Sequence, residues 1–392
     1  MRLLHTADWH LGRTLEGRSR LEEQAAVLDE IVRLAEEEAI DVVLLAGDVF
    51  DSVNPPAAAE QLFYETVARL ADKGRRPVVV IAGNHDNPDR LTASTPLAQE
   101  QGIVLLGYPV WQPLRLIVPS SGEALCLAAL PYPSEARLNE LLSDSPQAHL
   151  VQEAYDVRVK HLFQQLAAAF SPQTVNVAMS HLFVAGGQSS DSERPIEVGG
   201  AYTVQPTSLP AQAQYVALGH LHRPQAVRSS PVPARYAGSP LAYSFSEAGY
   251  AKSVTVVDVR PGEPADVKEI HLTAGRPLVQ WRATEGLAQV YRWMEEGRDK
   301  EAWIDLEVHV QEALMQEDIY RLRQRYPNFV HIRPVYPEQE ETIRLQAAAD
   351  MPIDELFRQF YRRQTGGAEP EEELVQLFLE LLQEEDEAEV AP

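Results

Sequence analysis

Short apolar runs alternate with amphipathic segments through about residue 180. The runs are rich in Val, Leu, Ile and Ala, and the segments between them repeat apolar residues at helical spacing. This alternation predicts buried strands connected by helices. Beyond residue 174, apolar runs follow one another through turns rich in Pro and Gly, which indicates further strands. We expect strands at 2–7, 41–47, 77–82, 174–180, 214–219, 232–237 and 253–260.

Three helices are expected between these strands. Ser19-x-x-Glu22 is a capping box that would begin a helix with Leu21, Leu28 and Val32 on its inner face. Asn54-Pro55-Pro56 predicts a second helix that ends at Gly74. A third is expected near 149–170. The fold class is therefore α/β (α+β), a β-sandwich of two sheets flanked by helices.

A new pattern begins after the turn residues between 262 and 277. Strand, helix, strand, helix and strand patterns lie in turn at 278–283, 286–296, 303–310, 315–325 and 329–334. This order predicts a small βαβαβ domain. We expect a first domain at 1–270, this second domain at 276–340, and polar helices with an acidic tail at 341–392.

Polar residues with metal-binding side chains stand where several apolar runs end. Since strand ends can meet at one edge of a sandwich, these side chains could converge on one site. Carboxylates, imidazoles and an amide oxygen suit Mn²⁺, Fe²⁺ or Zn²⁺ better than thiophilic ions. The sequence thus predicts a two-metal centre. Its candidate ligands are Asp8, His10, Asp48, Asn84, His181, His220 and His222.

Each of these motifs has an ordinary structural explanation when taken alone. Asp8 could be a surface carboxylate, Asn84 a turn residue, and His181 a histidine packed in the core. The placement of all seven at run ends argues for a shared function. His85 directly follows Asn84, where it can face a substrate instead of a metal, so it is the candidate catalytic residue.

Charge and cysteine content limit the function classes. The net charge of −24 argues against a nucleic-acid partner, because phosphate contacts normally come from Lys and Arg. Ten of those negative charges lie in residues 367–392, which leaves −14 for the other 366 residues. Cys126 is the only cysteine, so an internal disulfide or a thiolate cage is excluded. No apolar run reaches membrane-spanning length, and a cytoplasmic location is expected.

The metal motifs resemble a known superfamily in order and spacing. Asp8-x-His10, Gly47-Asp48-x-x-Asp51, Gly83-Asn84-His85-Asp86, His181 and Gly219-His220-x-His222 are similar to the calcineurin-like metallophosphoesterases. More narrowly, HTADWHLG at 5–12, GDVFD at 47–51, ALGHLHRPQ at 217–225 and YAGSPLAYSFSE at 236–247 resemble the SbcD family, nuclease subunits of bacterial SbcCD complexes. The resemblance covers about residues 1–260.

This resemblance implies a role for each residue of the candidate site. One ion would be held by Asp8, His10, Asp48 and His222, and the other by Asp48, Asn84, His181 and His220. His85 would act as a general acid or stabilise the transition state, while Asp51 and Asp86 would orient the ligands. The implied activity is Mn²⁺-dependent cleavage of DNA, as a 3′ to 5′ exonuclease on duplex ends and an endonuclease on single strands and hairpins, in DNA repair and recombination.

Partner contacts are expected in the second half of the chain. Ile353, Leu356 and Phe357, and later Leu374, Leu377 and Phe378, follow amphipathic helical spacing. These helices either pack on their own domain or dock on another chain. The resemblance implies binding to the coiled-coil base of an SbcC-type ATPase, a homodimer within a heterotetramer, and a capping role for the βαβαβ unit. Arginines that either touch DNA phosphates or form solvated faces are Arg13, Arg18, Arg321, Arg323, Arg325 and Arg333.

Two other functions remain open at this point. A phosphatase or a cyclic-nucleotide phosphodiesterase of the same superfamily would share the metal centre. The GDVFD motif, the second domain and the C-terminal helices argue against it. A scaffold without activity is the other alternative. The presence of all seven ligand types, together with His85, argues against a scaffold.

Overall fold

The computed structural model describes residues 1–143, 154–193, 202–311, 313–336, 352–364, 370, 372 and 374–379. The chain folds into two compact units. The first comprises 1–280, 299–305 and 328–331, and the second comprises 281–298, 306–327 and 332–392. The three-domain division expected from the sequence stays a prediction.

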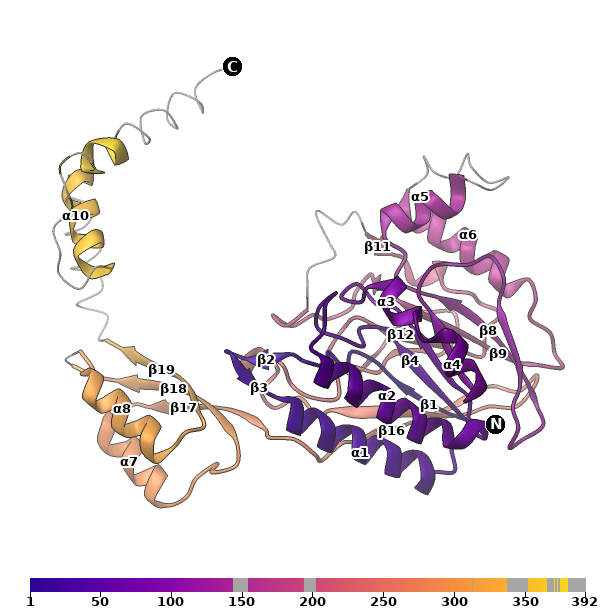
Figure 1. Cartoon of the computed structure of the whole chain (residues 1–392), viewed down its shortest axis with the longest axis horizontal. Coiled ribbons are helices and arrows are strands. Elements are labelled where there is room, and N and C mark those ends of the chain that lie inside the picture. The colour runs from indigo at the N-terminus through magenta and orange to yellow at the C-terminus, as the bar shows by residue number, and fades with distance from the viewer. Residues whose placement is uncertain are drawn as a thin grey trace. The chain divides into compact units, whose positions relative to one another are not determined.

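Two six-stranded sheets form the centre of the first unit (Figure 1). The first sheet has the order β16 (Asp266–His271), β15 (Ser253–Asp258), β1 (Arg2–Thr6), β4 (Val42–Ala46), β5 (Val78–Ile81) and β6 (Ile103–Leu106). The second has the order β13 (Gln225–Ala226), β14 (Ala234–Tyr236), β12 (Tyr215–Gly219), β9 (Val175–His181), β8 (Ala124–Leu130) and β7 (Leu114–Ile117).

Alternation along the strands builds three apolar layers. In β4, Val42 and Leu44 belong to a cluster that also takes side chains from β8, β9 and β12, whereas Val43 and Leu45 belong to a cluster with the helices α1 (Leu21–Glu37) and α2 (Ala57–Ala71). The helices α5 (Glu135–Ser143) and α6 (Tyr155–Ala167) cover the outer face of the second sheet. The predicted sandwich of two sheets flanked by helices is confirmed.

Short elements complete the first unit. They occur in the segments of the chain that connect the longer strands and helices. They are β2 (Thr14–Leu15), β3 (Arg18–Ser19), the 3₁₀ helix η1 (Asp72–Gly74), α3 (Pro88–Thr92), α4 (Thr95–Glu100), β10 (Phe183–Val184), β11 (Thr203–Val204), η3 (Pro206–Ser208) and η4 (Phe245–Glu247).

The helix ends differ from the sequence prediction in two places. The capping box at Ser19 is wrong, because α1 begins at Leu21 after Arg20 and has no side-chain cap. The Arg20 side chain is buried and donates to Glu23 and to the carbonyl of Ala242, and these contacts fix the start of the helix. The second helix ends at Ala71. Its predicted stop, Gly74, instead ends the short helix η1.

The βαβαβ order expected after residue 277 is present. It consists of β17 (Leu278–Ala283), α7 (Leu287–Glu295), β18 (Trp303–His309), α8 (Gln316–Arg325) and β19 (Phe329–Val335), with the three strands in the sheet order β17-β18-β19. Within the second unit, the ring of Trp281 lies 5.3 Å from that of Trp293 and 6.1 Å from that of Tyr326. Arg298 stacks over Trp293 at 4.3 Å. These contacts pack α7 and Tyr326 against β17.

The amphipathic segments near the C-terminus form helices where they are described. α10 (Ile353–Gln364) is helical, and so are residues 374–379. The rings of Phe357 and Phe378 stack at 4.3 Å, so the two segments contact each other. The acidic residues from Glu380 onward lie outside the described residues. Among the described helices, none combines the length and the apolar character needed to cross a bilayer.

Candidate metal centre

The carboxyl ends of five strands meet at one edge of the sandwich. β1, β4 and β5 run parallel in the first sheet, and β9 and β12 run parallel in the second. Parallel strands present their carboxyl ends on the same side. The residues that follow these strands are therefore neighbours. All seven predicted ligands, Asp8, His10, Asp48, Asn84, His181, His220 and His222, lie in this group, and each of them except Asn84 is buried.

Hydrogen bonds join the two sheets at this edge. Nδ1 of His181 in β9 lies 2.9 Å from the carbonyl oxygen of Ala46 in β4 and donates to it. The backbone N–H of His220 donates to the Asp8 carboxylate at 3.0 Å. Within the first sheet, the N–H of Asp8 donates to the carbonyl of Gly47 at 3.0 Å and ties the turn after β1 to the turn after β4. The relative position of the two sheets is thus fixed where the candidate ligands lie.

Four candidate ligands have left-handed backbone conformations. The φ angles are 55° for Asp8, 45° for His10, 49° for Asp48 and 107° for His220. Non-glycine residues seldom have positive φ, and each such residue costs on the order of 1–3 kcal/mol. The turns after β1, β4 and β12 therefore hold strained residues at the point where the ligands converge. Such strain is typical of functional sites.

Gly47 and Gly83 each precede a candidate ligand, at positions where the backbone lies very close to other candidate ligands. A Cβ atom on Gly83 would overlap the carboxylate and the backbone N–H of Asp48. Gly47 has a φ of 86°, and a Cβ there would overlap the ring of His181. A larger residue at either position would push ligands apart, so the glycines allow the two sheets to bring their ligands together.

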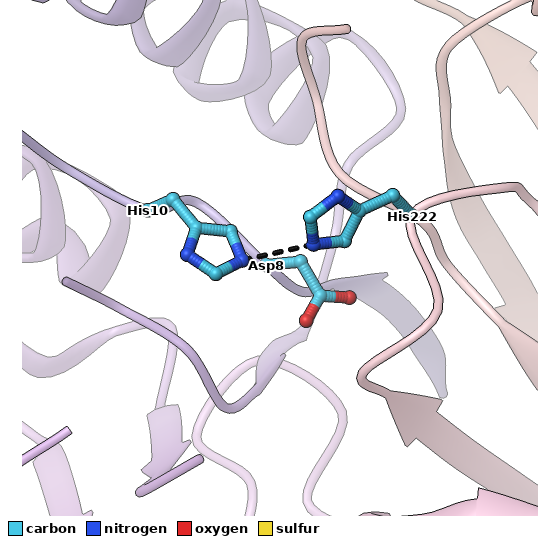
Figure 2. A group of neighbouring side chains, drawn as sticks. All are labelled: Asp8, His10 and His222. Carbon is cyan, nitrogen blue, oxygen red and sulfur yellow. Dashed lines mark hydrogen bonds between the residues drawn. The ribbon is translucent and has the colours of Figure 1, made fainter. Parts of the chain in front are cut away.

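One group of donor atoms consists of Asp8, His10 and His222 (Figure 2). Nε2 of His10 lies 2.9 Å from Nε2 of His222, and both rings are buried. Burial lowers the pKa of His10 to about 3 and also lowers the pKa of His222. Two neutral imidazoles thus direct ring nitrogens at each other beside a carboxylate. This donor set fits a divalent cation.

A second group consists of Asp8, Asp48 and His181. Nε2 of His181 lies 3.3 Å from Oδ2 of Asp48 and 2.9 Å from Oδ1 of Asn84. The ring of His220 lies 5.4 Å from that of His181. Asp48 also lies 3.7 Å from Nε2 of His10, so its carboxylate stands between the two groups. This position suits a residue shared by two ions.

The charges of the second group are coupled. Burial opposes protonation of His181, but Asp48, Asp8 and the Ala46 carbonyl outweigh it and raise the pKa of His181 to about 9. Burial likewise opposes ionisation of Asp48, yet the His181 imidazolium holds the pKa of Asp48 well below its ordinary value. Burial, with Asp48 as a further cause, raises the pKa of Asp8 well above its ordinary value. The positive charge of protonated His181 therefore offsets the charge of Asp48, as the charge of a bound metal ion would.

His85 lies beside both groups without belonging to either. Its backbone N–H donates to Asp48 at 2.8 Å, and its Nδ1 donates to the carbonyl of Asp51 at 2.8 Å. Its Nε2 is buried and has no hydrogen-bond partner among the described residues. Such a nitrogen can contact a bound substrate. His10, Asp51 and His85 form a third group of donor atoms. The Asp51 carboxylate lies 3.5 Å from Nδ1 of His10, so we interpret Asp51 as a residue that orients the His10 ring and not as a metal ligand.

Asp86 connects two of the ligand turns. Its carboxylate accepts from the backbone N–H groups of Val49 at 3.1 Å, Phe50 at 3.0 Å and Gly83 at 2.8 Å. The turn after β4 is thereby tied to the turn after β5. Burial and the charge of Asp48 raise the pKa of Asp86 to about 6, against the effect of these three bonds.

A buried polar network fixes the ring of His222. The Ser192 hydroxyl lies 2.5 Å from Nδ1 of His222 and donates to Glu247 at 2.6 Å, so Nδ1 is the donor and Nε2 keeps its lone pair. Lys252 donates to Glu247 and to the carbonyl of His222. The backbone N–H of His222 donates to Glu193 at 2.7 Å. Such partners orient metal-binding histidines.

The sequence prediction missed this network and one aromatic group. Tyr132 follows β8, at the same edge as the ligands, and its ring lies 6.3 Å from that of His181. Arg137 stacks over Tyr132 at 5.6 Å. A signal was available for Tyr132, since it comes directly after the apolar run ALCLAAL and one proline. Ser192 and Glu193 follow no apolar run, so no comparable signal marks them.

Five of the six arginines considered for phosphate contacts have partners within the described part of the chain. Arg13 donates to the carbonyl of Ser192, and Arg18 donates to the carbonyl of Phe329. In the second unit, exposed ion pairs join Arg321 to Glu317, Arg325 to Glu295 and Arg333 to Glu307. The structure thus favours structural roles for Arg13 and Arg18.

Comparisons with known proteins match this architecture. The family model described as "Calcineurin-like phosphoesterase" matches residues 1–224, and the model described as "Type 5 capsule protein repressor C-terminal domain" matches residues 274–365. The SbcD subunit of the nuclease SbcCD of Bacillus subtilis (strain 168) is 58% identical over 389 residues, which cover 98% of this chain and 100% of that protein. The chain belongs to the SbcD family of calcineurin-like phosphoesterases. The SbcD family assignment and the His and Asp clusters together indicate divalent metal use.

Solved structures also match. One is the crystal structure of TT1561 of Thermus thermophilus, at 14% identity and a TM-score of 0.36, covering 68% of this chain and 98% of that chain. Another is a dimetal phosphatase from Danio rerio, at 13% identity and a TM-score of 0.41, covering 70% of this chain and 99% of that chain.

Proposed function

We propose that this chain is a metal-dependent DNA nuclease that hydrolyses phosphodiester bonds as the SbcD-type component of a complex with an SbcC-type ATPase. One observation carries the proposal. The donor atoms of two carboxylates and several imidazoles converge at the end of the sandwich in a chain of the SbcD family, with the buried Nε2 of His85 beside them.

The proposed ligand sets follow the two donor groups. Asp8, His10, Asp48 and His222 would hold one ion, and Asp48, Asn84, His181 and His220 the other. Two distances support this assignment: 2.9 Å between Nε2 of His10 and Nε2 of His222, and 3.3 Å between Nε2 of His181 and Oδ2 of Asp48. Mn²⁺ is the proposed metal because the resemblance to the SbcD family implies it, and the mixed nitrogen and oxygen donors of both sets suit Mn²⁺ as they suit Fe²⁺ or Zn²⁺. A pair of such cations supplies Lewis-acid activation of water and neutralises charge on the attacked phosphate.

His85 would act on the leaving group. Its Nδ1–H is held by the carbonyl of Asp51, which directs Nε2 away from the protein backbone. From there, Nε2 in its protonated form can donate to the departing sugar oxygen, and in doing so it would lower the charge that develops on that oxygen. Asp51 and Asp86 would keep the turns around His85 in place. His85 is therefore the proposed catalytic residue.

The substrates proposed from the family are duplex ends, cleaved 3′ to 5′, and single strands or hairpins, cleaved internally. This activity would serve DNA end processing in repair and recombination. A decisive assay combines purified protein with labelled duplex and hairpin DNA in the presence of Mn²⁺, Mg²⁺ or a chelator. We expect cleavage with Mn²⁺ that the chelator abolishes. Absence of cleavage under every metal condition, with and without an SbcC-type partner, would overturn the proposal.

Another metallophosphoesterase, one that acts on small molecules, is the main alternative. A phosphatase or a cyclic-nucleotide phosphodiesterase would use the same donor groups. The same preparation should therefore be given a phosphomonoester, a cyclic nucleotide and duplex DNA at equal metal concentration. We expect DNA to be the preferred substrate. A preference for either small molecule would replace the nuclease assignment with that activity.

The proposed assembly is a homodimer within a heterotetramer that contains two ATPase subunits, located in the cytoplasm. The contact between Phe357 and Phe378 supports a folded helical pair as the docking element. Deletion of residues 341–392 should abolish co-purification with an SbcC-type ATPase and retain Mn²⁺-dependent cleavage of a small diester. Retained co-purification would show that the partner binds elsewhere.

A further inference from the structure

A polar cavity begins next to the candidate metal ligands of the second sheet. It has a volume of about 520 Å³ and is lined by the segments 185–188 and 223–229 together with Tyr236. Arg223 directly follows His222, and consecutive Cα atoms are about 3.8 Å apart. The segment 185–188 follows β10, which comes two residues after His181. We call this space the arginine cavity.

The charge of the arginine cavity contrasts with that of the chain. Within the part of the chain that the structure describes, its lining contains Arg223 and Arg228 and no carboxylate. The chain as a whole carries −24. Two other cavities in the described part of the chain differ from it: the lining of one includes Glu263, that of the other includes Glu285 and Asp318, and neither includes a Lys or an Arg.

The two arginines also differ from other arginines in their partners. Arg20, Arg90 and Arg158 each form an ion pair with a glutamate, as expected in an acidic chain. Arg223 and Arg228 form no ion pair with any acidic side chain among the described residues. Both are exposed. Their positive charge is therefore available to an anion from solution.

The lining is held in place before any ligand binds. Arg223 donates to Oε1 of Gln188 at 2.5 Å and lies 4.9 Å from the centre of the Tyr250 ring. Gln188 and Gln225 bond reciprocally through backbone and side-chain amides, at 2.9 and 2.8 Å. A guanidinium fixed in this way keeps further N–H donors for a phosphate, which arginine binds through parallel hydrogen bonds.

We propose that the arginine cavity binds a backbone phosphate of the substrate strand, next to the phosphate that is cleaved. This inference rests on the proposed nuclease function. A polymeric substrate that reaches the ligands at His222 carries its neighbouring phosphates past Arg223 because successive phosphates follow closely along a strand. Small phosphoesters have no second phosphate, so the arginine cavity would favour nucleic acid over small diesters.

The test compares an arginine that lines the arginine cavity with an arginine that does not. Arg228→Gln removes one positive charge from the arginine cavity, and Arg228 has no described side-chain contact to lose. Arg260→Gln removes the same charge from an exposed position past β15. Asp258 at the end of β15 pairs with Arg2 at the start of β1, whereas the candidate ligands follow the other end of β1. Ser229→Asp is a second variant that adds a negative charge to the lining. For each protein, DNA affinity is measured by anisotropy at several salt concentrations, and turnover is measured on DNA and on a small diester.

We expect Arg228→Gln and Ser229→Asp to weaken DNA binding by roughly three- to tenfold and to raise KM for DNA more than they lower kcat. The slope of log K against log salt should fall in magnitude by about 1 for Arg228→Gln. Arg260→Gln should match the unaltered chain. Equal affinity and equal salt slope in Arg228→Gln and Arg260→Gln would overturn the inference, even if the unaltered chain cleaves DNA. Failure of the unaltered chain to cleave DNA would instead overturn the proposed function.

Discussion

Nε2 of His181 lies 3.3 Å from Oδ2 of Asp48, while Nδ1 of the same ring donates to the carbonyl of Ala46. The ring thus connects the second sheet to the first and faces the carboxylate proposed to bridge the ions. In metal-free protein, a proton on Nε2 neutralises Asp48. Binding of a metal at this nitrogen requires that the proton leave.

The stability of the metal-free protein should therefore depend on pH. The pKa of His181 is raised to about 9 from an ordinary 6.5, so the stability from this charge is fully present below pH 6.5 and is lost as pH rises through 9. We expect Tm of chelator-treated protein to fall across this window. His181→Gln should flatten the decline. Parallel Tm curves for the two proteins would contradict the pairing of His181 with Asp48.

Metal binding should release a proton below pH 9. Calorimetric titration of the chelator-treated protein with Mn²⁺ at about pH 7.5, in two buffers with different ionisation enthalpies, should give heats that differ in proportion to the protons released. We expect release of about one proton from His181. His181→Gln should bind less metal and release less. Identical heats in both buffers for the unaltered chain would contradict the assignment.

Removal of the His85 ring should separate chemistry from metal binding. His85→Ala deletes the nitrogen proposed to donate to the leaving oxygen and leaves the seven candidate ligands in place, so turnover should fall by about 10²- to 10⁴-fold. Metal content, measured by elemental analysis after dialysis, should stay that of the unaltered chain. His85→Gln can donate a hydrogen bond but cannot transfer a proton, so it should recover little of the lost activity. A fully active His85→Ala protein would remove His85 from the mechanism.

Glu247 should matter for both stability and metal affinity. Its carboxylate is fully buried, accepts from Ser192 and pairs with buried Lys252. Glu247→Gln leaves Lys252 without its counter-charge, which typically costs about 3–5 kcal/mol in the free energy of unfolding. It also loosens the orientation of His222, so metal affinity should fall by about 10- to 100-fold.

The double variant Glu247→Gln with Lys252→Met is the control for Glu247. Removing the uncompensated lysine should recover part of the unfolding free energy, measured by denaturant titration, because no buried charge is left unpaired. Metal affinity should stay reduced, since the Ser192 hydroxyl has still lost its carboxylate partner. Full recovery of metal affinity would show that Glu247 acts on stability alone.

A methyl group at Gly83 should disturb the metal centre directly. Its Cβ would overlap the Asp48 carboxylate, so Gly83→Ala should lower metal affinity and Tm together. Gly17→Ala is the control: it has a φ of 77° but open space around its Cβ, so we expect a cost of only about 1 kcal/mol and unchanged metal affinity. Equal metal affinity in the two variants would mean that the approach of Gly83 to Asp48 is not required.

The strand ends could be predicted well from the sequence, for a physical reason. Buried parallel strands need continuous apolar runs, so the end of each run marks the end of the strand closely, as at Ala46 and Ile81. Parallel pairing then brings the following residues to one edge. The convergence of Asp48 and Asn84 could thus be predicted without coordinates.

Contacts between distant turns could not be predicted in this way. Ser192 lies 30 residues before His222, and Glu247 lies 55 residues after Ser192, with no periodic pattern that connects them. The error at Ser19 has a similar cause. The start of its helix is set by the bond from Arg20 to the Ala242 carbonyl, 222 residues away, which local helix-start patterns do not contain.

The positive φ angles of Asp8, His10, Asp48 and His220 have a consequence for mutagenesis. Any residue at these positions must tolerate a backbone twist and also supply a donor atom, and Asp, Asn and His are among the few that do both. Alanine does neither, so an alanine scan of this edge would mix the loss of a ligand with the unwinding of its turn. Asparagine keeps the turn and one acceptor oxygen while it removes the charge and the second acceptor, which makes Asp8→Asn and Asp48→Asn cleaner measures than alanine of what each carboxylate contributes.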